Sequence, residues 1–520
     1  MNGAESLVKT LLAGRVDVCF TNPGTSEMHF VAALDAHADM RCVLGLQENV
    51  VTGAADGYAR MIDRPATTLL HLGPGLSNGL ANIHNAKKSR TGMVNIVGDH
   101  ATYHRKFDAP LTSDIEGIAG PVSHWVRTSP TADHLSRDAA QAITRASTRP
   151  GQIATLILPA DCAWSETRQP IVTADLATAP DGPDPEGVRK IADILRSGEP
   201  TVIIMGGRTL RQAPLELAGS ILAGTHNTTL KAEASNARVE RGAGRMPVDR
   251  IPYPIDQALQ ALAGFQHAIT IEARDPVAFF AYPGKPSRIL PEHCHVHELV
   301  GPDGNGELAL EMLADELGVR TVPPPVASLF LAPPVAGPLD PDSIVSVVAN
   351  AIPENAIIID EAITTGREFF PATSTAQPHT WLQINGGAIG IGIPLAVGAA
   401  IAAPDRPVIA LQADGSAMFT VQGLWSQARE GLNITTIIFH NRSYKILLAE
   451  MRNVGVENPG PSALDMLELD RPALDWVSIA RGMGVEAGRA ADGETLARQL
   501  QRGLACEGPY LIEASLRAGG

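Results

Sequence analysis

The chain has 520 residues, and its 41 lysines and arginines against 56 aspartates and glutamates give a formal net charge of −15 at pH 7. Nucleic acids and anionic membranes would repel such a chain, so we expect neither as a partner and expect cytoplasmic chemistry on small molecules. Hydrophobic residues make up 44% and charged residues 19% of the chain, which excludes a disordered or fibrous protein. At roughly 150 residues per domain, the length indicates about three domains.

The cysteines indicate a reducing environment. They lie far apart and form no C-x-x-C pair, a pattern that fits neither a disulfide framework nor a thiolate zinc site. We therefore expect reduced, buried thiols at Cys19, Cys42, Cys162, Cys294 and Cys506.

Two segments bear on membrane association. Glu5 and Lys9 lie where a signal peptide would need an apolar core, so we do not expect secretion. Residues 386–403 are uncharged over 18 positions, but they contain five glycines and Pro394. We predict a buried loop and helix there, because these residues disfavour a membrane-spanning helix.

Short apolar runs alternate with helical patterns along the chain, which is typical of βαβ units and parallel sheets. The predicted strands are residues 67–72, 93–97, 153–158, 201–205, 267–271, 356–359, 408–412, 435–439 and 509–513. Proline-rich segments at 163–185 and 321–341 are typical of linkers. The sequence therefore predicts an α/β protein with three doubly wound parallel-sheet domains, at residues 1–165, 185–322 and 340–520.

Polar side chains follow two neighbouring predicted strands in the last third of the chain. Asp414 follows strand 408–412, and Asn441 follows strand 435–439. Because the carboxyl ends of parallel strands meet at one edge of a sheet, we expect these two residues to share an ion. Carboxylate and carbonyl oxygens suit Mg²⁺, which also accepts phosphate oxygens. Gly415 and Ser416 then begin a helix whose free N–H groups can hold a phosphate.

This pattern resembles the diphosphate-binding motif of thiamine diphosphate (ThDP) enzymes, which begins GDG and ends NN. Here the motif begins ADG, and 26 residues separate Asp414 from Asn441. The resemblance implies that Asp414, Asn441 and the backbone carbonyl of Ser443 hold Mg²⁺. The two departures from the motif, at positions 413 and 440, leave these metal ligands in place.

A second motif lies in the first third of the chain. Residues 44–60 read LGLQENVVTGAADGYAR, in which a predicted strand ends near Glu48 and a helix of small residues begins. The segment resembles the acetolactate synthase and benzoylformate decarboxylase branch of ThDP enzymes, whose glutamate at this place contacts the cofactor's aminopyrimidine. A carboxyl group there favours the imino form of the ring, so the resemblance implies a catalytic and cofactor-binding role for Glu48. Without such a partner, burying this carboxyl group would be costly.

Two loops carry further candidates. Residues 70–79 (LHLGPGLSNG) resemble the family's GPG loop near the cofactor, which implies a contact at Gly73; their spacing does not fit a dinucleotide fingerprint. His71 stands where benzoylformate decarboxylase has an active-site histidine, which implies a proton shuttle, although a hydrogen-bonded core histidine explains it equally well. In the turn 22–28, Thr25 or Ser26 is implied to offer a hydroxyl to the substrate carboxylate, although turn chemistry alone also explains these residues.

The same resemblance reaches the substrate side of the site. Ile389 matches the apolar residue that holds ThDP in its bent form, and residues 360–366 resemble a loop that meets the diphosphate and the substrate. Beyond the metal loop, Tyr444 is implied to contact the cofactor, and Ile446 and Leu447 the substrate.

The middle third departs from the acetolactate synthases that bind FAD. Those enzymes carry an Arg-Phe-Asp-Asp-Arg type segment where this chain has IEARDPVAFF at 271–280, so we do not expect bound FAD. His293, His295 and His297 alternate and would face one way on a strand. No fourth metal ligand lies near them in the sequence, so we expect a polar strand end.

In the relatives, the groups that match Glu48 and Asp414 meet across a subunit boundary, which implies a homodimer or homotetramer. The expected function is ThDP- and Mg²⁺-dependent decarboxylation of a 2-oxo acid with carboligation, as in acetolactate synthase, without flavin. The alternative is a benzoylformate-type decarboxylase that releases an aldehyde. Residues 95–115 and the overall pattern resemble the first branch, whereas His71 and the missing flavin segment favour the second. A third hypothesis, a ThDP-binding paralogue without activity, is disfavoured by the retained Glu48.

Overall fold

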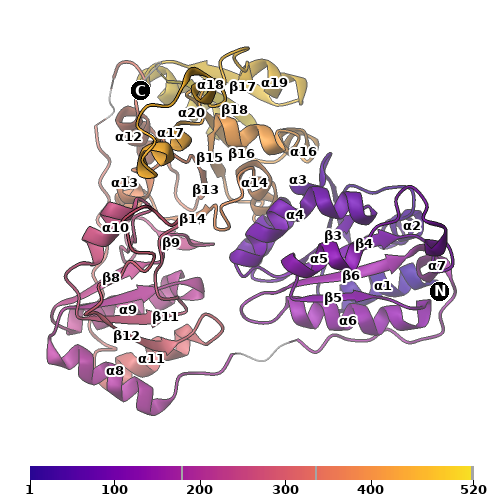
Figure 1. Cartoon of the computed structure of the whole chain (residues 1–520), viewed down its shortest axis with the longest axis horizontal. Coiled ribbons are helices and arrows are strands. Elements are labelled where there is room, and N and C mark those ends of the chain that lie inside the picture. Colours follow the sequence, from indigo (N-terminus) through magenta and orange to yellow (C-terminus); the bar gives the residue numbers. More distant parts are fainter. Residues whose placement is uncertain (177–179, 334–335, 517–520) are drawn as a thin grey trace.

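Three lobes, each built on its own sheet, make up the protein (Figure 1). The computed structural model describes residues 1–176, 180–333 and 336–516. Residues 177–179 and 334–335, which fall in the two predicted linkers, lie outside the described residues. Among the described helices, none is both long enough and apolar enough to span a membrane.

The first lobe holds a six-stranded sheet in the order β2-β1-β3-β4-β6-β5, with every pair of neighbours parallel. Its strands are β1 (Val18–Thr21), β2 (Arg41–Leu44), β3 (Ala66–Leu70), β4 (Met93–Asp99), β5 (Trp125–Thr128) and β6 (Ile153–Pro159). Its helices are α1 (Gly3–Ala13), α2 (Met28–Asp35), α3 (Glu48–Ile62), α4 (Leu72–Lys88), α5 (Ile115–Ala119), α6 (Leu135–Ala146) and α7 (Ala160–Trp164). Helices α1, α2 and α6 share one core with the sheet, and α3 and α4 share a second. Helices cover both faces, so the central strands β3, β4 and β6 are buried at every residue.

The middle lobe holds a five-stranded parallel sheet in the order β10-β8-β7-β11-β12. Its strands are β7 (Thr201–Met205), β8 (Thr228–Ala232), β10 (Asp249–Arg250), β11 (His267–Ile271) and β12 (His295–Val300). Its helices are α8 (Pro185–Ser197), α9 (Gln212–Gly224), α10 (Ile255–Leu262) and α11 (Gly306–Leu317), with the short 3₁₀ helix η4 (Gly207–Leu210) after β7.

The C-terminal lobe holds a seven-stranded sheet in the order β17-β18-β16-β15-β13-β14-β9. Its strands are β9 (Val239–Arg241), β13 (Ile357–Glu361), β14 (His379–Gln383), β15 (Val408–Ala413), β16 (Ile434–His440), β17 (Glu486–Ala490) and β18 (Tyr510–Ser515). Its helices are α12 (Pro341–Ala351), α13 (Phe369–Ala372), α14 (Gly392–Ala402), α15 (Asp414–Ala417), α16 (Gly423–Arg429), α17 (Lys445–Asn453), α18 (Pro461–Asp465), α19 (Trp476–Gly482) and α20 (Gly493–Leu504). Strand β9 runs antiparallel to β14 and comes from the middle third of the chain.

Helices α3 and α14 join the first and C-terminal lobes (Figure 1). Their backbones touch at glycines: a Cβ built on Gly57 would lie 2.2 Å from the carbonyl oxygen of Leu395, and one on Gly398 would lie 1.8 Å from that of Ala54. Any larger residue would force the two helices apart, so the glycines of these helices fix how the lobes meet.

The predicted fold of three doubly wound parallel sheets is confirmed, with β9 as an antiparallel exception that crosses the predicted border of the middle domain. The domain limits themselves stay a prediction. The prediction of a buried loop and helix at residues 386–403 holds for helix α14 but is wrong for the loop before it, in which Gly387 is exposed and Ala388 and Ile389 are half-buried. The prediction of buried thiols is wrong for exposed Cys42 and half-buried Cys506, whereas the other three cysteines are buried and all five are free.

Candidate active site

Glu48 begins helix α3 at the carboxyl edge of the first sheet and is buried, with 7% of its surface exposed. Two side-chain amides donate to its carboxylate: Asn22 Nδ2 lies 3.2 Å from Oε1, and Asn78 Nδ2 lies 3.0 Å from Oε2. Leu46 is exposed, so these segments rather than Leu46 enclose the carboxylate. No cation pairs with it in the described chain, which leaves lone pairs for a proton on a ligand.

His71 and Glu27 form a second polar pair at the same sheet edge. Nδ1 of His71 lies 2.9 and 3.1 Å from the two carboxylate oxygens of Glu27, whose residue is 2% exposed. The same carboxylate accepts the backbone N–H of Gly24 at 2.9 Å and the hydroxyl of Ser26 at 2.5 Å. Sequence reasoning missed Glu27, because no local pattern marks a glutamate after a turn as buried.

The GPG segment departs from the prediction of a loop. Strand β3 ends at Leu70, before the predicted limit, and Gly73 lies in the first turn of α4. A Cβ on Gly73 would lie 1.9 Å from Ser113 Oγ, so close packing already explains this glycine.

Thr25 and Ser26 line a cavity of about 340 Å³ together with His29, His100 and Trp164. Ser26 donates its hydroxyl to Glu27, whereas Thr25 makes no side-chain hydrogen bond within the described chain. Of the two predicted hydroxyls, that of Thr25 is therefore the one available to a ligand.

Asp414 follows β15 directly and is 1% exposed. Its carboxylate accepts the backbone N–H groups of Arg442, at 2.7 Å, and of Gly415, at 2.8 Å. Burial raises the pKa of Asp414, and the N–H groups of Arg442 and Gly415 oppose that rise. The contact to Arg442 brings Asp414 against the loop that follows β16.

That loop carries Asn441 and Ser443. The side-chain oxygen of Asn441 accepts the backbone N–H of Ser443 at 2.9 Å, and Arg442 between them has φ +60°. The preceding His440 turns toward β18, where its Nδ1 lies 3.1 Å from Glu513.

The helix after Asp414 is short and buried. Ser416 Oγ accepts from Gln412 at 2.8 Å and donates to the carbonyl of Ala413 at 3.1 Å. A Cβ on Gly415 would lie 2.5 Å from the ring of Tyr444, so the tyrosine lies directly over this glycine.

Beyond Tyr444, helix α17 contains Ile446 and Leu447 and has no buried residue. Leu447 is 43% exposed, so the helix can present apolar side chains to a ligand. On the same helix, Glu450 accepts the hydroxyl of Tyr253 at 3.5 Å, which links α17 to the middle lobe.

Ile389 lies in the loop between β14 and α14, and helix α4 fixes this loop. Asn85 on α4 donates to the carbonyl of Ala388 at 2.7 Å and accepts its N–H at 3.2 Å. On the other side, buried Glu361 accepts the N–H groups of Gly390 at 2.7 Å and Gly392 at 2.6 Å. Glu361 lies within the predicted segment 360–366. Its carboxylate binds the backbone of the loop that carries Ile389 and does not face solvent.

The structure thus brings the predicted residues together in two groups. Glu48, His71, Thr25 and Ser26 lie at the carboxyl edge of the first sheet, and Asp414 lies with the residues 415–416, 441 and 443–444 in the C-terminal lobe. Within the described chain no hydrogen bond or ion pair joins the two groups.

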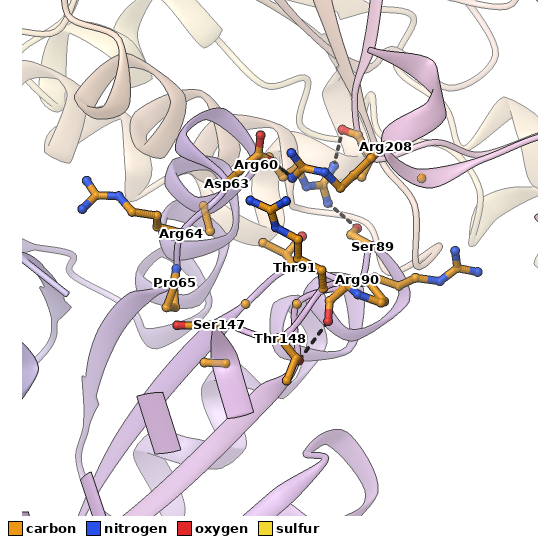
Figure 2. A pocket seen from close by; sticks show the side chains of 18 of the residues that line it. Arg60, Asp63, Arg64, Pro65, Ser89, Arg90, Thr91, Ser147, Thr148 and Arg208 are labelled. Atoms are coloured by element: carbon orange, nitrogen blue, oxygen red, sulfur yellow. Dashed lines mark hydrogen bonds and ion pairs between the residues drawn. The ribbon is translucent and has the colours of Figure 1, made fainter. Parts of the chain in front are cut away.

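A cavity of about 470 Å³ lies between the first and middle lobes, away from both groups. Arg60, Arg90 and Arg208 are among the arginines that gather around it (Figure 2). Beside it, Glu272 directs its carboxylate to two helix starts, accepting the N–H of Arg208 at 2.7 Å and of Gly306 at 2.8 Å.

The three alternating histidines of the middle lobe do not form a metal site. His267 Nδ1 lies 3.1 Å from His297 Nε2, and His267 Nε2 lies 2.7 Å from Glu199. Of the predicted trio, His295 and His297 are on β12, and His293 precedes the strand. No cluster of three or more His, Cys, Asp or Glu residues suited to a metal occurs in the described ranges.

Two segments of the chain match known domain families. Residues 1–119 match the thiamine pyrophosphate enzyme N-terminal TPP binding domain, and residues 366–514 match the corresponding C-terminal TPP binding domain. Thiamine pyrophosphate is another name for ThDP, and the two segments contain Glu48 and Asp414. The chain belongs to the thiamine pyrophosphate enzyme family, as its motifs predicted.

The chain is similar over nearly its whole length to proteins named for two different activities. It is 51% identical over 516 residues to the Mycobacterium tuberculosis protein named "Putative acetolactate synthase large subunit IlvX", covering 99% of this chain and 98% of that protein. It is 30% identical over 525 residues to benzoylformate decarboxylase from Pseudomonas aeruginosa, covering 95% of each chain. The ThDP-dependent 4-hydroxybenzoylformate decarboxylase of Rhodococcus jostii RHA1 has the same fold, with TM-score 0.85, 23% identity and coverage of 100% of this chain and 99% of that one.

Proposed function

We propose that this protein catalyses the ThDP- and Mg²⁺-dependent decarboxylation of a 2-oxo acid without flavin. The observation that carries the proposal is the buried Glu48 carboxylate, held by Asn22 and Asn78 beside the pair of His71 and Glu27. A buried carboxylate with two neutral donors and no cation is suited to hold a protonated ring nitrogen.

The residues present fit the cofactor at both ends. Asp414 is a buried carboxylate with a raised pKa, which a nearby cation would relieve. With Asn441 and the carbonyl of Ser443 it offers the oxygen ligands that Mg²⁺ prefers, and the ion would complete its shell with phosphate oxygens and water. Ile389 and Tyr444 would border the cofactor, and Gly415 and Ser416 would lie at the diphosphate.

ThDP, when bound, supplies a nucleophilic carbon and an electron sink that absorbs the electrons released as carbon dioxide leaves. The role of this chain is to bind, orient and move protons. Glu48 would hold a proton at the aminopyrimidine, and Thr25 would donate its free hydroxyl to the substrate carboxylate. Nε2 of His71 would deliver a proton to the product, and Ile446 and Leu447 would exclude water.

The contacts of Glu272 in the middle lobe are the reason why the proposal does not include a bound flavin. Its carboxylate takes the N–H groups of Arg208, which follows β7, and of Gly306, which begins α11 after β12. These backbone donors would otherwise be free for a nucleotide phosphate. A nucleotide phosphate at these two helix starts would find both donors occupied.

The fate of the substrate fragment separates two candidates. The contact of His71 with Glu27 favours protonation of the substrate fragment and release of an aldehyde. This is the outcome expected of a decarboxylase, the activity named for the 30% identical relative. Carboligation to a second carbonyl compound is the second candidate, favoured by the 51% identity to the acetolactate synthase-named relative.

We also propose a homodimer or homotetramer. No contact joins Glu48 to Asp414 within one described chain, so a second chain is the simplest way for one cofactor to reach both.

The deciding experiment incubates purified protein with ThDP, Mg²⁺ and either pyruvate or benzoylformate, and measures carbon dioxide and products. Benzaldehyde supports the decarboxylase, and acetolactate supports the carboligase. No carbon dioxide from a panel of 2-oxo acids, despite ThDP uptake by calorimetry, would leave a binding protein without activity.

A further inference from the structure

Glu27 is a buried carboxylate whose partners are all hydrogen-bond donors or a histidine. It accepts from Gly24 N–H and from the hydroxyl of Ser26, and it faces Nδ1 of His71 with both oxygens. The described chain offers it no lysine or arginine. A carboxylate so enclosed can meet a ring nitrogen stably only when that nitrogen carries a proton, because two acceptors would repel each other.

Two glycines make room for this contact. A Cβ on Gly98, in strand β4, would lie 1.8 Å from Oε1 of Glu27. A Cβ on Gly24 would lie 2.0 Å from Nδ1 of His71. Neither glycine has a positive φ, so space rather than backbone conformation requires glycine at both positions.

The other ring nitrogen of His71 is in a different situation. Nε2 has no hydrogen-bond partner in the described part of the chain, and the side chain is 21% exposed. Helix α4 starts directly after His71, and the Cβ position of Gly75 in its first turn lies 3.2 Å from His71 Cβ and 3.3 Å from Glu48 Oε1. The histidine therefore stands next to the carboxylate that would hold the cofactor ring.

We propose that Glu27 is a positioning residue that keeps a proton on Nδ1 of His71, so that Nε2 alone exchanges protons with the substrate. This inference rests on the proposed function. In the step, the Nε2–H bond breaks and a C–H bond forms at the carbon that has lost carbon dioxide. The ring is left neutral with its proton on Nδ1, and water then reprotonates Nε2. Fixing one tautomer through a carboxylate is a general way to orient a working imidazole.

Three variants test the proposal. Glu27→Leu removes the acceptor, and Gly98→Ala displaces the carboxylate without changing any polar group. Glu27→Gln keeps one acceptor oxygen, so its effects on the His71 tautomer and on kcat should be smaller than those of the other two variants. Asp138→Asn is the matched control, because Asp138 is a buried carboxylate of the same lobe that binds Ser129 and Arg127 instead.

The first readout needs no turnover. In protein labelled with ¹⁵N-histidine, the His71 signals, assigned by their loss in His71→Asn, should show the Nδ1–H tautomer in the wild type and in Asp138→Asn. In Glu27→Leu and in Gly98→Ala, the His71 signals should no longer show the Nδ1–H tautomer. A wild-type His71 protonated on Nε2 when neutral, or an unchanged tautomer in Glu27→Leu, would overturn the proposal.

The second readout is kinetic. With a 2-oxo acid that the wild type converts, Glu27→Leu and Gly98→Ala should lower kcat for aldehyde release by about 100-fold, the scale of losing one proton-transfer group, with KM little changed. A loss no greater than in Asp138→Asn would also overturn the proposal. If the wild type converts no 2-oxo acid but the tautomer behaves as expected, the proposed function fails while the positioning role of Glu27 stands.

Discussion

The first and C-terminal lobes hold their buried carboxylates in different ways. Glu48 is held by side-chain amides from two other segments, Asn22 and Asn78, whereas Asp414 is held by backbone N–H groups of Gly415 and Arg442. Side-chain donors can rotate away when a partner changes, but backbone donors are fixed by the strand ends that carry them. Under the proposed function, the first lobe would serve chemistry on the cofactor ring, and the C-terminal lobe would provide fixed geometry around an ion and a phosphate.

The difference predicts that Glu48 controls turnover more than binding. Glu48→Gln should lower carbon dioxide release by about 1000-fold, within the range for losing a proton-transfer group, because an amide can still accept and donate but cannot stabilise a ring proton. ThDP uptake, measured by calorimetry, should persist. Glu430→Gln, at a partly exposed pair with Arg41, should leave both unchanged. Full turnover in Glu48→Gln would remove the assigned role.

The junction between the lobes should depend on Arg60. Its ion pair with Asp56 is 2.6 Å long and almost fully buried, and it also donates to the carbonyl of Gln383 at 2.8 Å in the C-terminal lobe. Arg60→Ala would leave the Asp56 carboxylate buried and unpaired, at a cost of about 3–5 kcal/mol.

Thermal unfolding measures this effect, with Arg64→Ala as the control one turn along the chain. Arg64 pairs with Asp17 at 3.7 Å with both side chains exposed, so its loss should cost no more than about 1 kcal/mol. Equal unfolding midpoints in the two variants would contradict a role for Arg60 in joining the lobes.

Asp414 should control the binding of ThDP, whereas Glu48 should control turnover. Asp414→Asn removes the only carboxylate among the proposed Mg²⁺ ligands and should weaken Mg²⁺-dependent ThDP uptake roughly 100-fold, equivalent to about 2.7 kcal/mol. Calorimetry with and without Mg²⁺ checks this, and Asp405→Asn, at an exposed position, is the control. Unchanged uptake in Asp414→Asn would place the ion elsewhere.

The same contrast explains what the sequence could predict. Asp414 and Asn441 directly follow neighbouring strands, and backbone N–H groups hold Asp414 in place. A short sequence pattern is therefore enough to predict where these residues lie. Asn78 and Glu27 act across turns and helices, and their partners lie 30 and 44 residues away. Only the folded sheet edge shows that these side chains meet, which is why neither was predicted.

The fold follows the same logic. Apolar strand patterns identified most of the central strands, because those strands are buried on both faces. The interior strands β1, β8 and β14 were not among the predicted strands. Strand β9 escaped prediction, since its three residues pair with β14 from another third of the chain. The start of α4 also escaped, because Gly73 and Pro74 suggest a turn although proline is favoured in a first helical turn.

Acid should weaken the C-terminal lobe more than the first. His379 in β14 is fully buried, and burial, with the nearby charges of Arg241 and Arg245, lowers its pKa from 6.5 to about 3. The unfolded chain takes up a proton near pH 6.5 and the folded chain does not until about pH 3. Stability that is complete above pH 6.5 is therefore lost as the pH falls, by about 1.4 kcal/mol per unit below that value.

Urea denaturation at pH 7.5 and 5.5, followed by tryptophan fluorescence, tests this smallest effect. His379→Gln should reduce the difference between the two pH values by about 1.4 kcal/mol, because glutamine binds no proton in the unfolded chain. His226→Gln, at an exposed position, is the control variant and should leave the difference unchanged. If the two variants keep the same pH difference, acid acts through other groups, and the contrast between the lobes does not extend to their response to pH.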